Sequence, residues 1–381
     1  MNYANVFTEI GYHVVFIGAD NCSDMATNGL VKTKVLDYDV WNFECSRRLR
    51  YKINDFLGTK NVLSVVSKYD DVQAIIFYNY RSIPFLRMVY YCRKNDIKVI
   101  SNTTEWYASK SGKNIGFQFV KNLDTALRMK VVNNKVDGLI VTSSFLKDFY
   151  KGSEVVVVPS LSESASESAI RLNPIEAKDS RETIRFIYAG NPFSIGTRIK
   201  DRSIMKDRLD KAIGYFYRVF VEGYDFQFDI YGLTREQYLN SLPEDQAMLD
   251  ALEGRIFFHG FVRSDVVCSA IRNADFTVLI RDVNRVTLAG FPTKIAESIN
   301  LGIPVLTTRL GDMDKYVNED KTGFFFRPDN DDYNISVVRR VLAMDRDEIE
   351  SMKKCCREST VFRWVNWVSP ISEFLNRLWV D

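Results

Sequence analysis

The sequence has few of the residues that build zinc sites and disulfide frameworks. Its 381 residues include six cysteines and two histidines, and no CxxC pair occurs. Because zinc is usually held by clustered Cys and His side chains, His13 and His259 make a His/Cys zinc site unexpected. The scattered cysteines are typical of reduced thiols inside a cell rather than of a secreted disulfide scaffold.

Long apolar runs, a leader-like N-terminus and an excess of one charge are also missing. No stretch approaches the ~20 apolar residues that span a bilayer, and the N-terminus lacks the basic-then-apolar order of a signal peptide. Lys and Arg number 51 against 49 Asp and Glu, whereas a dedicated nucleic-acid binder usually has a strong basic excess. We therefore expect a cytoplasmic protein with no nucleic-acid partner.

Two glycine-rich nucleotide-binding motifs are absent as well. No G-x-G-x-x-G follows a predicted strand, which argues against a hydride-transfer dehydrogenase, and no P-loop occurs. A nucleotide site in this chain must therefore be built in another way.

What the chain does contain is a regular alternation of short apolar strands with amphipathic helical stretches. Uniformly apolar strands such as AIIFY and VVVV favour sheets that are covered on both faces. This alternation predicts α/β domains with doubly wound parallel sheets. The predicted strands are 13–17, 73–78, 98–101, 138–142, 154–158, 184–189, 227–231, 255–258, 276–280, 305–307 and 323–326. The predicted helices are 47–69, 83–95, 116–134, 144–150, 203–222 and 263–273.

The chain length and one serine-rich segment predict two domains. PSLSESASESAI, beginning at Pro159, can bury little and is typical of a surface connection. We predict one Rossmann-like domain over residues 1–160, a linker over 161–182 and a second Rossmann-like domain over 183–360. The Trp-rich segment 361–381 is predicted to form a terminal amphipathic helix.

The first domain begins unusually. Its first residues, NYANVFTEIGYHVVFIG, read as the end of a helix followed by a strand. A doubly wound domain normally starts one strand earlier, with a Gly-rich turn into that helix. The first strand is therefore expected to be missing, through either shortening or reduction of the first unit.

The stretch AGFPTKIAESINLGIPVLTT predicts an anion site at a helix N-terminus. Pro292 suits the first helical turn, where its missing N–H costs nothing. Gly302 and Pro304 end the helix before a short strand. The unpaired N–H groups of the first turn then favour phosphate or another anion.

Several segments, taken in order, resemble glycosyltransferases of family 4, which have two Rossmann-like domains facing a cleft (the GT-B fold). The segments that resemble the donor-binding domain are FIYAGNP…RIKD (186–201), FHGFV (258–262), ADFTVLIRD (274–282) and AGFPTKIAESINLGIPV (289–305). Those that resemble the first domain of members acting on bacterial surface polysaccharide are NTTEWY (102–107), ALRM (126–129) and DGLIVTSSFLKDFY (137–150).

The resemblance implies a retaining, hexosyl-type glycosyltransferase. Its donor would be a nucleotide-diphosphate sugar, and its acceptor a glycan or lipid-linked molecule in capsule, O-antigen or exopolysaccharide synthesis. It implies no cofactor and no metal, an acceptor-binding first domain, a donor-binding second domain, and a C-terminal helix that returns to the first domain. Lipid-linked acceptors would suit peripheral binding at the inner face of the cell membrane.

The resemblance also assigns candidate site residues. In the family two Glu residues separated by seven positions flank the donor site; here the second is Glu297, expected to bind the nucleotide ribose, and the first position holds Ala289. Lys200, with Arg198 as second choice, is the candidate cation for the leaving phosphate. Glu105 is the candidate acceptor-side carboxylate. The predicted catalytic residues are Lys200 and Glu105, and the predicted donor-binding residues are Gly190, Asn191, Arg198, His259, Gly260, Gly290, Phe291, Thr293, Lys294 and Glu297.

Plainer interpretations of the same residues stay open. Spacing alone favours a surface ion pair between Glu297 and Lys294, and RIKDRSIMKDRLDK is typical of a solvated helix face. Residues 105–135, with six basic and two acidic side chains, could form a solvated helix or contact an anionic membrane. A non-catalytic nucleotide-sugar-binding protein and a nucleotide-sugar 2-epimerase are the alternative functions.

Overall fold

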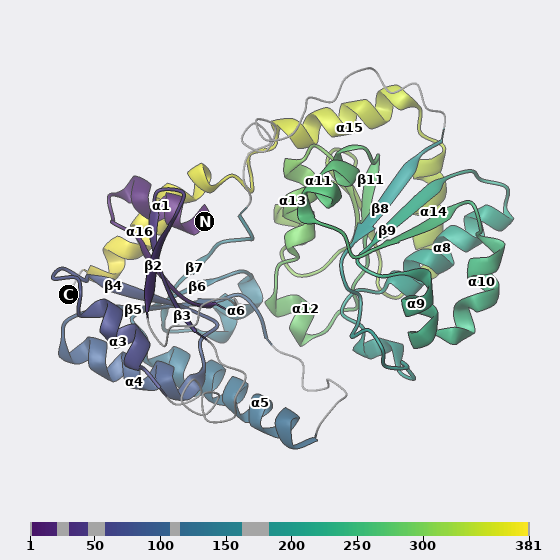
Figure 1. Cartoon of the computed structure of the whole chain (residues 1–381). Helices are drawn as coiled ribbons and strands as arrows, with labels where there is room; N and C mark the ends of the chain where they lie inside the picture. The colour runs from purple at the N-terminus through teal and green to yellow at the C-terminus, as the bar shows by residue number, and fades with distance from the viewer. Residues whose placement is uncertain (1, 21–29, 45–57, 107–114, 162–182, 380–381) are drawn as a thin grey trace. The chain divides into compact units, whose positions relative to one another are not determined.

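The computed structural model describes residues 2–20, 30–44, 58–106, 115–161 and 183–379. The chain divides into two compact units (Figure 1). The first unit comprises Met1–Pro159 together with Trp367–Asp381, and the second comprises Ser160–Asn366. Apart from Leu161, the predicted linker lies outside the described residues.

The first unit contains a four-stranded parallel sheet of order β4-β5-β6-β7. Its strands are β4 (Ala74–Tyr78), β5 (Lys98–Thr103), β6 (Gly138–Val141) and β7 (Glu154–Val157). Its helices are α3 (Lys60–Val66), α4 (Ser82–Lys94), α5 (Ile115–Leu127) and α6 (Ser144–Phe149). Helix α5 continues into a π-helical turn, Arg128–Val132. The strands predicted for this sheet from the sequence are confirmed to within two residues.

The N-terminal residues form a separate three-stranded sheet that the sequence did not predict. After α1 (Asn2–Ile10), strand β1 (Val15–Asp20) pairs in parallel with β3 (Tyr38–Glu44), and β2 (Val31–Val35) pairs with β3 in antiparallel fashion. The strand predicted over 13–17 therefore exists as β1, but it lies outside the four-stranded sheet. The hairpin turn is Leu36–Asp37, and it lacks the Asn-Gly or Asp-Gly signal by which such turns are recognised.

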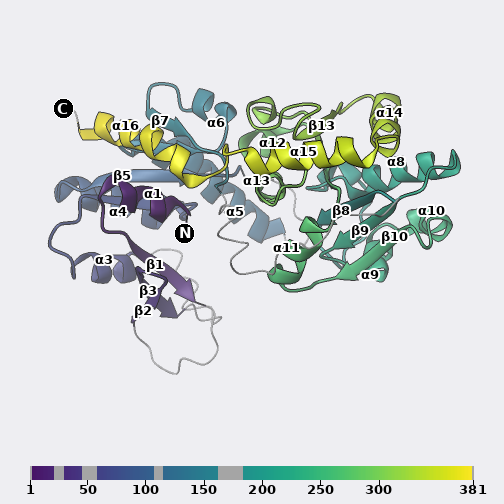
Figure 2. The same ribbon diagram turned by 90° about the horizontal axis from the view of Figure 1, so that it is seen from above.

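The C-terminal helix α16 (Val368–Trp379) packs against β7 and α1, within the first unit (Figure 2). Phe374 lies over β6 at Gly138, where an added Cβ would come within 2.6 Å of its ring. Both Phe374 and Leu378 are buried. The close approach explains why this position of β6 has no side chain.

The second unit is built on a six-stranded parallel sheet of order β10-β9-β8-β11-β12-β13. Helices cover both faces of this sheet, as expected for a doubly wound domain (Figure 1). Its strands are β8 (Arg185–Ala189), β9 (Gln227–Tyr231), β10 (Ile256–Gly260), β11 (Phe276–Leu279), β12 (Val305–Thr308) and β13 (Gly323–Phe326). Its helices are α8 (Leu209–Val221), α9 (Arg235–Ser241), α10 (Gln246–Ala251), α11 (Ser264–Arg272), α12 (Arg285–Ala289), α13 (Thr293–Asn300), α14 (Asp331–Leu342) and α15 (Arg346–Glu358). The six predicted strands are confirmed to within two residues.

The strand order of the second unit has a switch point between β8 and β11. From β8 the chain adds β9 and β10 on one side, and then returns to place β11 on the other side of β8. In open parallel sheets, ligands bind outside the carboxyl ends of the strands at such a point. The loops after β8 and β11 are therefore the first place to look for a site.

Candidate active site

The loop after β8 packs tightly against the loop after β9. Gly190 donates its N–H to the carbonyl of Tyr231 (2.9 Å). Gly232 has φ of 110°, and a Cβ at this position would collide with the carbonyl of Gly190. Two glycines thus let the two loops touch at the carboxyl edge of the sheet.

Asp207 is the centre of a buried polar cluster at the switch point. Its side chain is 1% exposed and accepts hydrogen bonds from the Tyr188 hydroxyl (2.9 Å) and from Nε of Arg281 (2.8 Å), while Lys294 donates to the same carboxylate. Burial alone would raise the pKa of Asp207, but the charges of Arg281 and Lys294 outweigh burial and lower it to about 2. Asp207 is therefore ionised at neutral pH.

Lys294 reaches Asp207 by crossing over Gly190. A Cβ at Gly190 would collide with the end of the Lys294 side chain, so the glycine is required for this contact as well. Lys294 also donates to the Tyr188 hydroxyl (3.2 Å), and burial of this phenol raises its pKa. The loop, the strand and the first turn of α13 are thereby joined around one carboxylate.

The cluster holds more cations than its carboxylate can balance. Burial lowers the pKa of Lys294, and the nearby charges of Arg281 and Lys206 lower it further, against the attraction of Asp207. Lys206 is held beside the loop because its N–H donates to the carbonyl of Pro192 (3.0 Å). Two cations, Arg281 and Lys294, share the one carboxylate and keep its pKa low, whereas burial is the main cause of the lowered pKa of Lys294. Such a surplus of positive charge favours a bound anion.

Helix α13 opens beside the cluster. Pro292 is its N-cap residue and no side chain caps it, so its first-turn amides keep their capacity to bind an anion. The side chain of Phe291 packs edge-on against Tyr316, at a centroid distance of 5.1 Å, and lies 5.5 Å from the ring of Phe362. These aromatic contacts fix the turn that leads into the helix.

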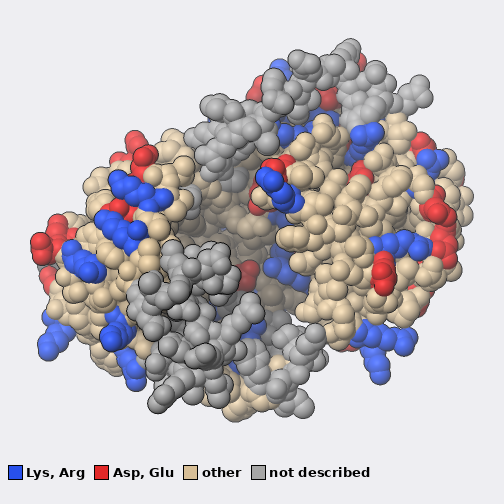
Figure 3. Space-filling view, viewed as in Figure 1, with Lys and Arg blue, Asp and Glu red and all other residues tan. Residues whose placement is uncertain are grey.

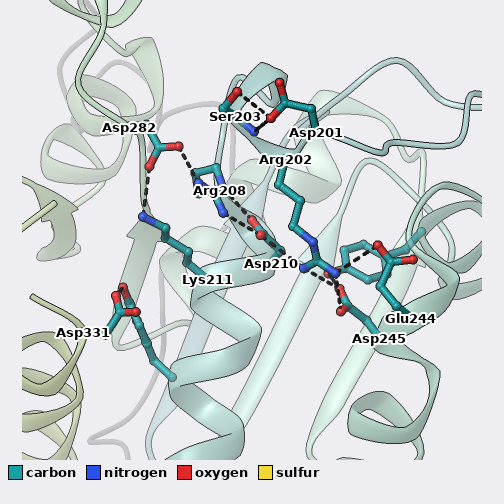
Figure 4. A network of polar contacts seen from close by, with 12 residues as sticks. Asp201, Arg202, Ser203, Arg208, Asp210, Lys211, Glu244, Asp245, Asp282 and Asp331 are labelled. Carbon is teal, nitrogen blue, oxygen red and sulfur yellow. Dashed lines mark hydrogen bonds and ion pairs between the residues drawn. The ribbon is translucent and has the colours of Figure 1, made fainter. Parts of the chain in front are cut away.

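A second charged network fixes the segment before α8 (Figure 4). Arg208 bonds to Asp210 (2.8 Å) and to Asp282 in the loop after β11, and Lys211 pairs with Asp282 at 3.0 Å. Arg202 pairs with Asp245 at 2.7 Å. The plainer interpretation of this segment was a solvated helix face. That interpretation does not hold, because Asp207 and Asp210 are buried and the helix begins only at Leu209.

The two cations chosen from the sequence lie outside the cluster. Lys200 and Arg198 are exposed in the loop between Gly190 and the 3-10 turn Arg202–Ile204, and within the described residues neither makes an ion pair. Asn191 is also exposed in this loop. Glu105 follows β5 in the first unit and is half-buried.

Glu297 and Lys294 do not form the ion pair that their spacing favoured, because Lys294 pairs with Asp207 instead. Glu297 is exposed on α13, one turn beyond Thr293. Desolvation by neighbouring protein atoms raises the pKa of its carboxyl group, although Lys294 opposes this. Gly290 ends α12 just before this helix. The structure thus brings Gly190, Gly290, Thr293, Lys294 and Glu297 to the same edge of the sheet.

His259 lies at the end of β10 in a polar and aromatic setting. Its Nε2 lies 2.7 Å from Oδ1 of Asp229, and its ring stacks on Tyr231 at a centroid distance of 4.3 Å. Gly260 has φ of 68° and its carbonyl accepts from the N–H of Gly232 (2.8 Å). The two residues therefore flank the glycine contact between the loops after β8 and β9.

Sequence reasoning missed Asp207, Tyr188, Arg281 and Lys206. Arg281 had a signal, since a charged residue directly after an apolar strand lies at the carboxyl edge of a sheet. Asp207 had none, because its partners lie 74 and 87 residues away along the chain. Among the residues that the structure describes, no group of three or more His, Cys, Asp or Glu could hold a metal ion.

Several solved structures share the fold of this chain. The chain is similar to the sucrose-phosphate synthase of Thermosynechococcus elongatus (14% identity, TM-score 0.64, covering 98% of this chain and 90% of that one). It is also similar to trehalose-6-phosphate synthase of E. coli bound with UDP-2-fluoro glucose (10% identity, TM-score 0.61, covering 99% of this chain and 94% of that one). A third similar structure is Anabaena HepE in complex with UDP (13% identity, TM-score 0.57, covering 89% of this chain and 86% of that one). The fold is therefore GT-B, and the predicted fold class is confirmed.

A protein-family model also matches part of the second unit. Residues 204–344 match the model described as glycosyl transferases group 1. A search of the curated proteins finds no match. The matched region and the fold together support a glycosyltransferase, as predicted, while the hexosyl type of the transferred group stays a prediction. Assignment to family 4 and to surface-polysaccharide synthesis stays a prediction.

Proposed function

We propose that the second unit binds a nucleotide-diphosphate sugar with its diphosphate at the switch-point cluster, defined as Tyr188, Asp207, Arg281 and Lys294. The observation that carries this proposal is the surplus of cations over the single buried carboxylate there. The opening of α13 lies beside it without a side-chain cap. A diphosphate would supply the missing negative charge.

The cluster suits the departure of a diphosphate. Negative charge grows on the leaving phosphate as the sugar transfers, and fixed cations aimed at that charge are the main catalytic device available. Lys294 and Arg281 are held in place by Asp207, so little reorganisation is needed during the reaction. We assign the exposed Lys200 and Arg198 a second role, contact with the diphosphate from the loop side.

The nucleotide would extend along the same edge of the sheet. We propose that Glu297 binds the ribose and that the stacked ring of His259 lies near the base. Anabaena HepE with UDP or UDP-glucose and the E. coli enzyme with UDP-2-fluoro glucose make UDP-sugars the first donors to test.

The acceptor side is assigned to the first unit. We propose that a glycan or lipid-linked acceptor of bacterial surface polysaccharide binds there, with Glu105 facing it, and that transfer retains the anomeric configuration without a metal. In this mechanism the departing phosphate takes the proton of the acceptor hydroxyl on the same face. No helix in the described part of the chain is long and apolar enough to cross a bilayer, so contact with a lipid-linked acceptor would be peripheral.

One observation favours a second candidate function. Ala289 stands where the family's first donor-site Glu would be, and it is fully buried. A chain without that carboxylate could bind a nucleotide sugar and fail to transfer it. This non-catalytic reading predicts donor affinity without turnover.

A donor screen followed by product analysis tests the proposal. Thermal shifts with UDP-, GDP- and dTDP-sugars would identify the donor, and proton NMR of the products would give the anomeric configuration, with and without EDTA. Transfer with retention that survives EDTA supports the full proposal. Binding without turnover favours the non-catalytic reading, and an isomerised donor sugar indicates a 2-epimerase. A site that binds no nucleotide sugar would overturn all three.

A further inference from the structure

Helix α5 and the π-helical turn that continues it present an apolar stripe to solvent. Its members share a spacing of four residues, with one neighbour at the start, and each is exposed over more than a third of its surface. The stripe consists of Phe119 (69%), Val120 (46%), Leu123 (50%), Leu127 (38%) and Val131 (39%). At a rise of 1.5 Å per residue it extends for about 18 Å along one face. A soluble domain seldom exposes such a row without a partner.

The opposite face of the same helix is anchored in the first unit. Thr125, Met129 and Val132 are buried. Asp124, the one acidic residue of the helix, accepts hydrogen bonds from the N–H (2.9 Å) and the hydroxyl (2.7 Å) of Ser82 at the start of α4. These contacts fix the orientation of the helix, and the exposed stripe therefore always faces away from the core of the first unit.

Basic side chains lie at the end of the stripe and on the neighbouring helix α4. Lys130 is exposed in the turn that carries the end of the stripe. Helix α4, which packs against α5, carries Arg87, Arg93 and Lys94 on its exposed surface and has no acidic residue. Figure 3 shows Lys and Arg but no Asp or Glu on the lower left of the viewed face, over the α3 and α4 region. Exposed apolar side chains beside basic ones are the pattern of an interfacial helix.

We propose that this face of α4 and α5 docks onto an anionic phospholipid surface, with Phe119, Leu123 and Leu127 entering the acyl boundary. The basic side chains of α4 then contact the headgroups. This inference rests on the proposed function in one respect: docking would bring the enzyme to a lipid-linked acceptor. The choice of lipid over a protein partner follows from charge, because cations lie beside the apolar row and the one carboxylate on the two helices, Asp124, is bonded to Ser82.

Vesicle co-sedimentation of the full chain tests the docking, with phosphatidylcholine vesicles that contain or lack phosphatidylglycerol. We expect binding to the anionic vesicles that weakens as salt is raised. The double variant F119S/L123S should lower the partition coefficient at least about tenfold, and R87E/K94E should lower it at low salt but much less at high salt. Val221→Ser, which changes an equally exposed side chain at the end of α8, is the matched control and should bind as the wild type does.

Three results would overturn the inference. One is that the wild type fails to sediment with anionic vesicles at low salt; another is that F119S/L123S binds like the control. The third is a concentration-dependent self-association, abolished by F119S/L123S, in a chain that ignores vesicles, since the stripe would then bind a second copy. Vesicle binding needs no donor sugar. A chain that binds vesicles but transfers no sugar would therefore contradict the proposed function and still support the docking surface.

Discussion

The carboxyl edges of the two parallel sheets are built from different chemistry. In the second unit the edge is charged, with Asp207 holding Arg281 and Lys294. In the first unit the buried part of the edge is neutral, with Thr103, at the end of β5, bonded to the buried Asn133. Cations match a diphosphate, whereas the neutral groups of the first unit are buried and bonded to one another. The difference favours the second unit as the donor unit.

The neutral edge is as well connected as the charged one. The Asn133 amide donates to Thr103 (3.0 Å) and to the Tyr150 hydroxyl (2.8 Å), and its oxygen accepts from Ser101 (2.9 Å). Burial raises the pKa of Tyr150 to about 12, so this phenol stays neutral. The energetic consequences differ, because a broken neutral network leaves an unpaired dipole, whereas a broken ionic one leaves an uncompensated charge.

Removing the carboxylate of the charged edge should have the largest effect. Asp207→Ala leaves the charges of Arg281 and Lys294 partly buried without a partner, and it should lower the free energy of unfolding of the second unit by about 3–5 kcal/mol. Urea unfolding, combined with amide hydrogen exchange of β8 and β11, measures this. Glu236→Ala, at an exposed position in the first turn of α9, should stay within about 0.5 kcal/mol of the wild type. An Asp207→Ala loss below about 1 kcal/mol would show that the cluster does not hold the edge together.

The strands of the second unit were predictable because each has a clear local sequence pattern. Runs such as FTVL and VLTT contain only apolar residues and threonine and are bounded by charged residues, Gly or Pro. The three-stranded sheet of the first unit gave weaker local signals, since the two-residue turn Leu36–Asp37 carries no glycine. The strand order, and with it the switch point, depends on pairings between distant segments that no local pattern specifies.

The site was predictable only in part, for a related reason. The glycines and the helix N-terminus at residues 289–294 have local causes and could be found from the sequence. The partners of Asp207 are set by tertiary structure, and a run as charged as RIKDRSIMKDRLDK looks solvated until it is folded against β11. Lys200 was chosen from this run, but Lys206, six residues later, is the lysine beside the cluster.

Removing one cation from the charged edge should separate binding from structure. Lys294→Met should lower kcat/KM for the donor by about 10²–10³, the usual cost of losing one preorganised electrostatic contact. Lys206→Met and Lys200→Met, compared side by side in initial-rate assays, would show which of these two exposed lysines contributes more to the reaction. The exposed Lys321→Met serves as control and should keep wild-type kinetics. Equal rates for Lys294→Met and the control would contradict a donor site at this edge.

Acid should weaken the charged edge and spare the neutral one. The pKa of Asp207 is lowered from 3.8 to about 2, so its stabilising contribution is complete above about pH 4 and is lost as the pH falls toward 2. This shift corresponds to about 2 kcal/mol. Unfolding free energies measured across that range should fall faster for the wild type than for Asp207→Asn. Parallel curves for the two proteins would mean that the carboxylate is not specially stabilised.

Breaking the neutral edge should cost less than breaking the charged one. Asn133→Ala should lower the free energy of unfolding of the first unit by about 1 kcal/mol, since the hydroxyls of Ser101 and Thr103 already lie 3.0 Å apart and can bond to each other. Donor affinity, measured by calorimetry, should not change. A loss as large as that for Asp207→Ala would remove the energetic distinction between the two edges.

The smallest change in stability is expected on substitution of Glu297, and it should be a gain, whereas the other substitutions lower stability. Its raised pKa means that the fold disfavours the ionised carboxyl group, a penalty that is absent below about pH 4 and grows as the pH rises through the folded-state pKa. Glu297→Gln should therefore raise the melting temperature slightly at pH 7 and leave it unchanged in acid, while donor affinity falls. Glu358→Gln, at an exposed position on α15, should change neither quantity. If Glu297→Gln gained stability and kept full donor affinity, the carboxylate would have no part in ribose binding, and the charged edge would recognise its ligand by the diphosphate alone.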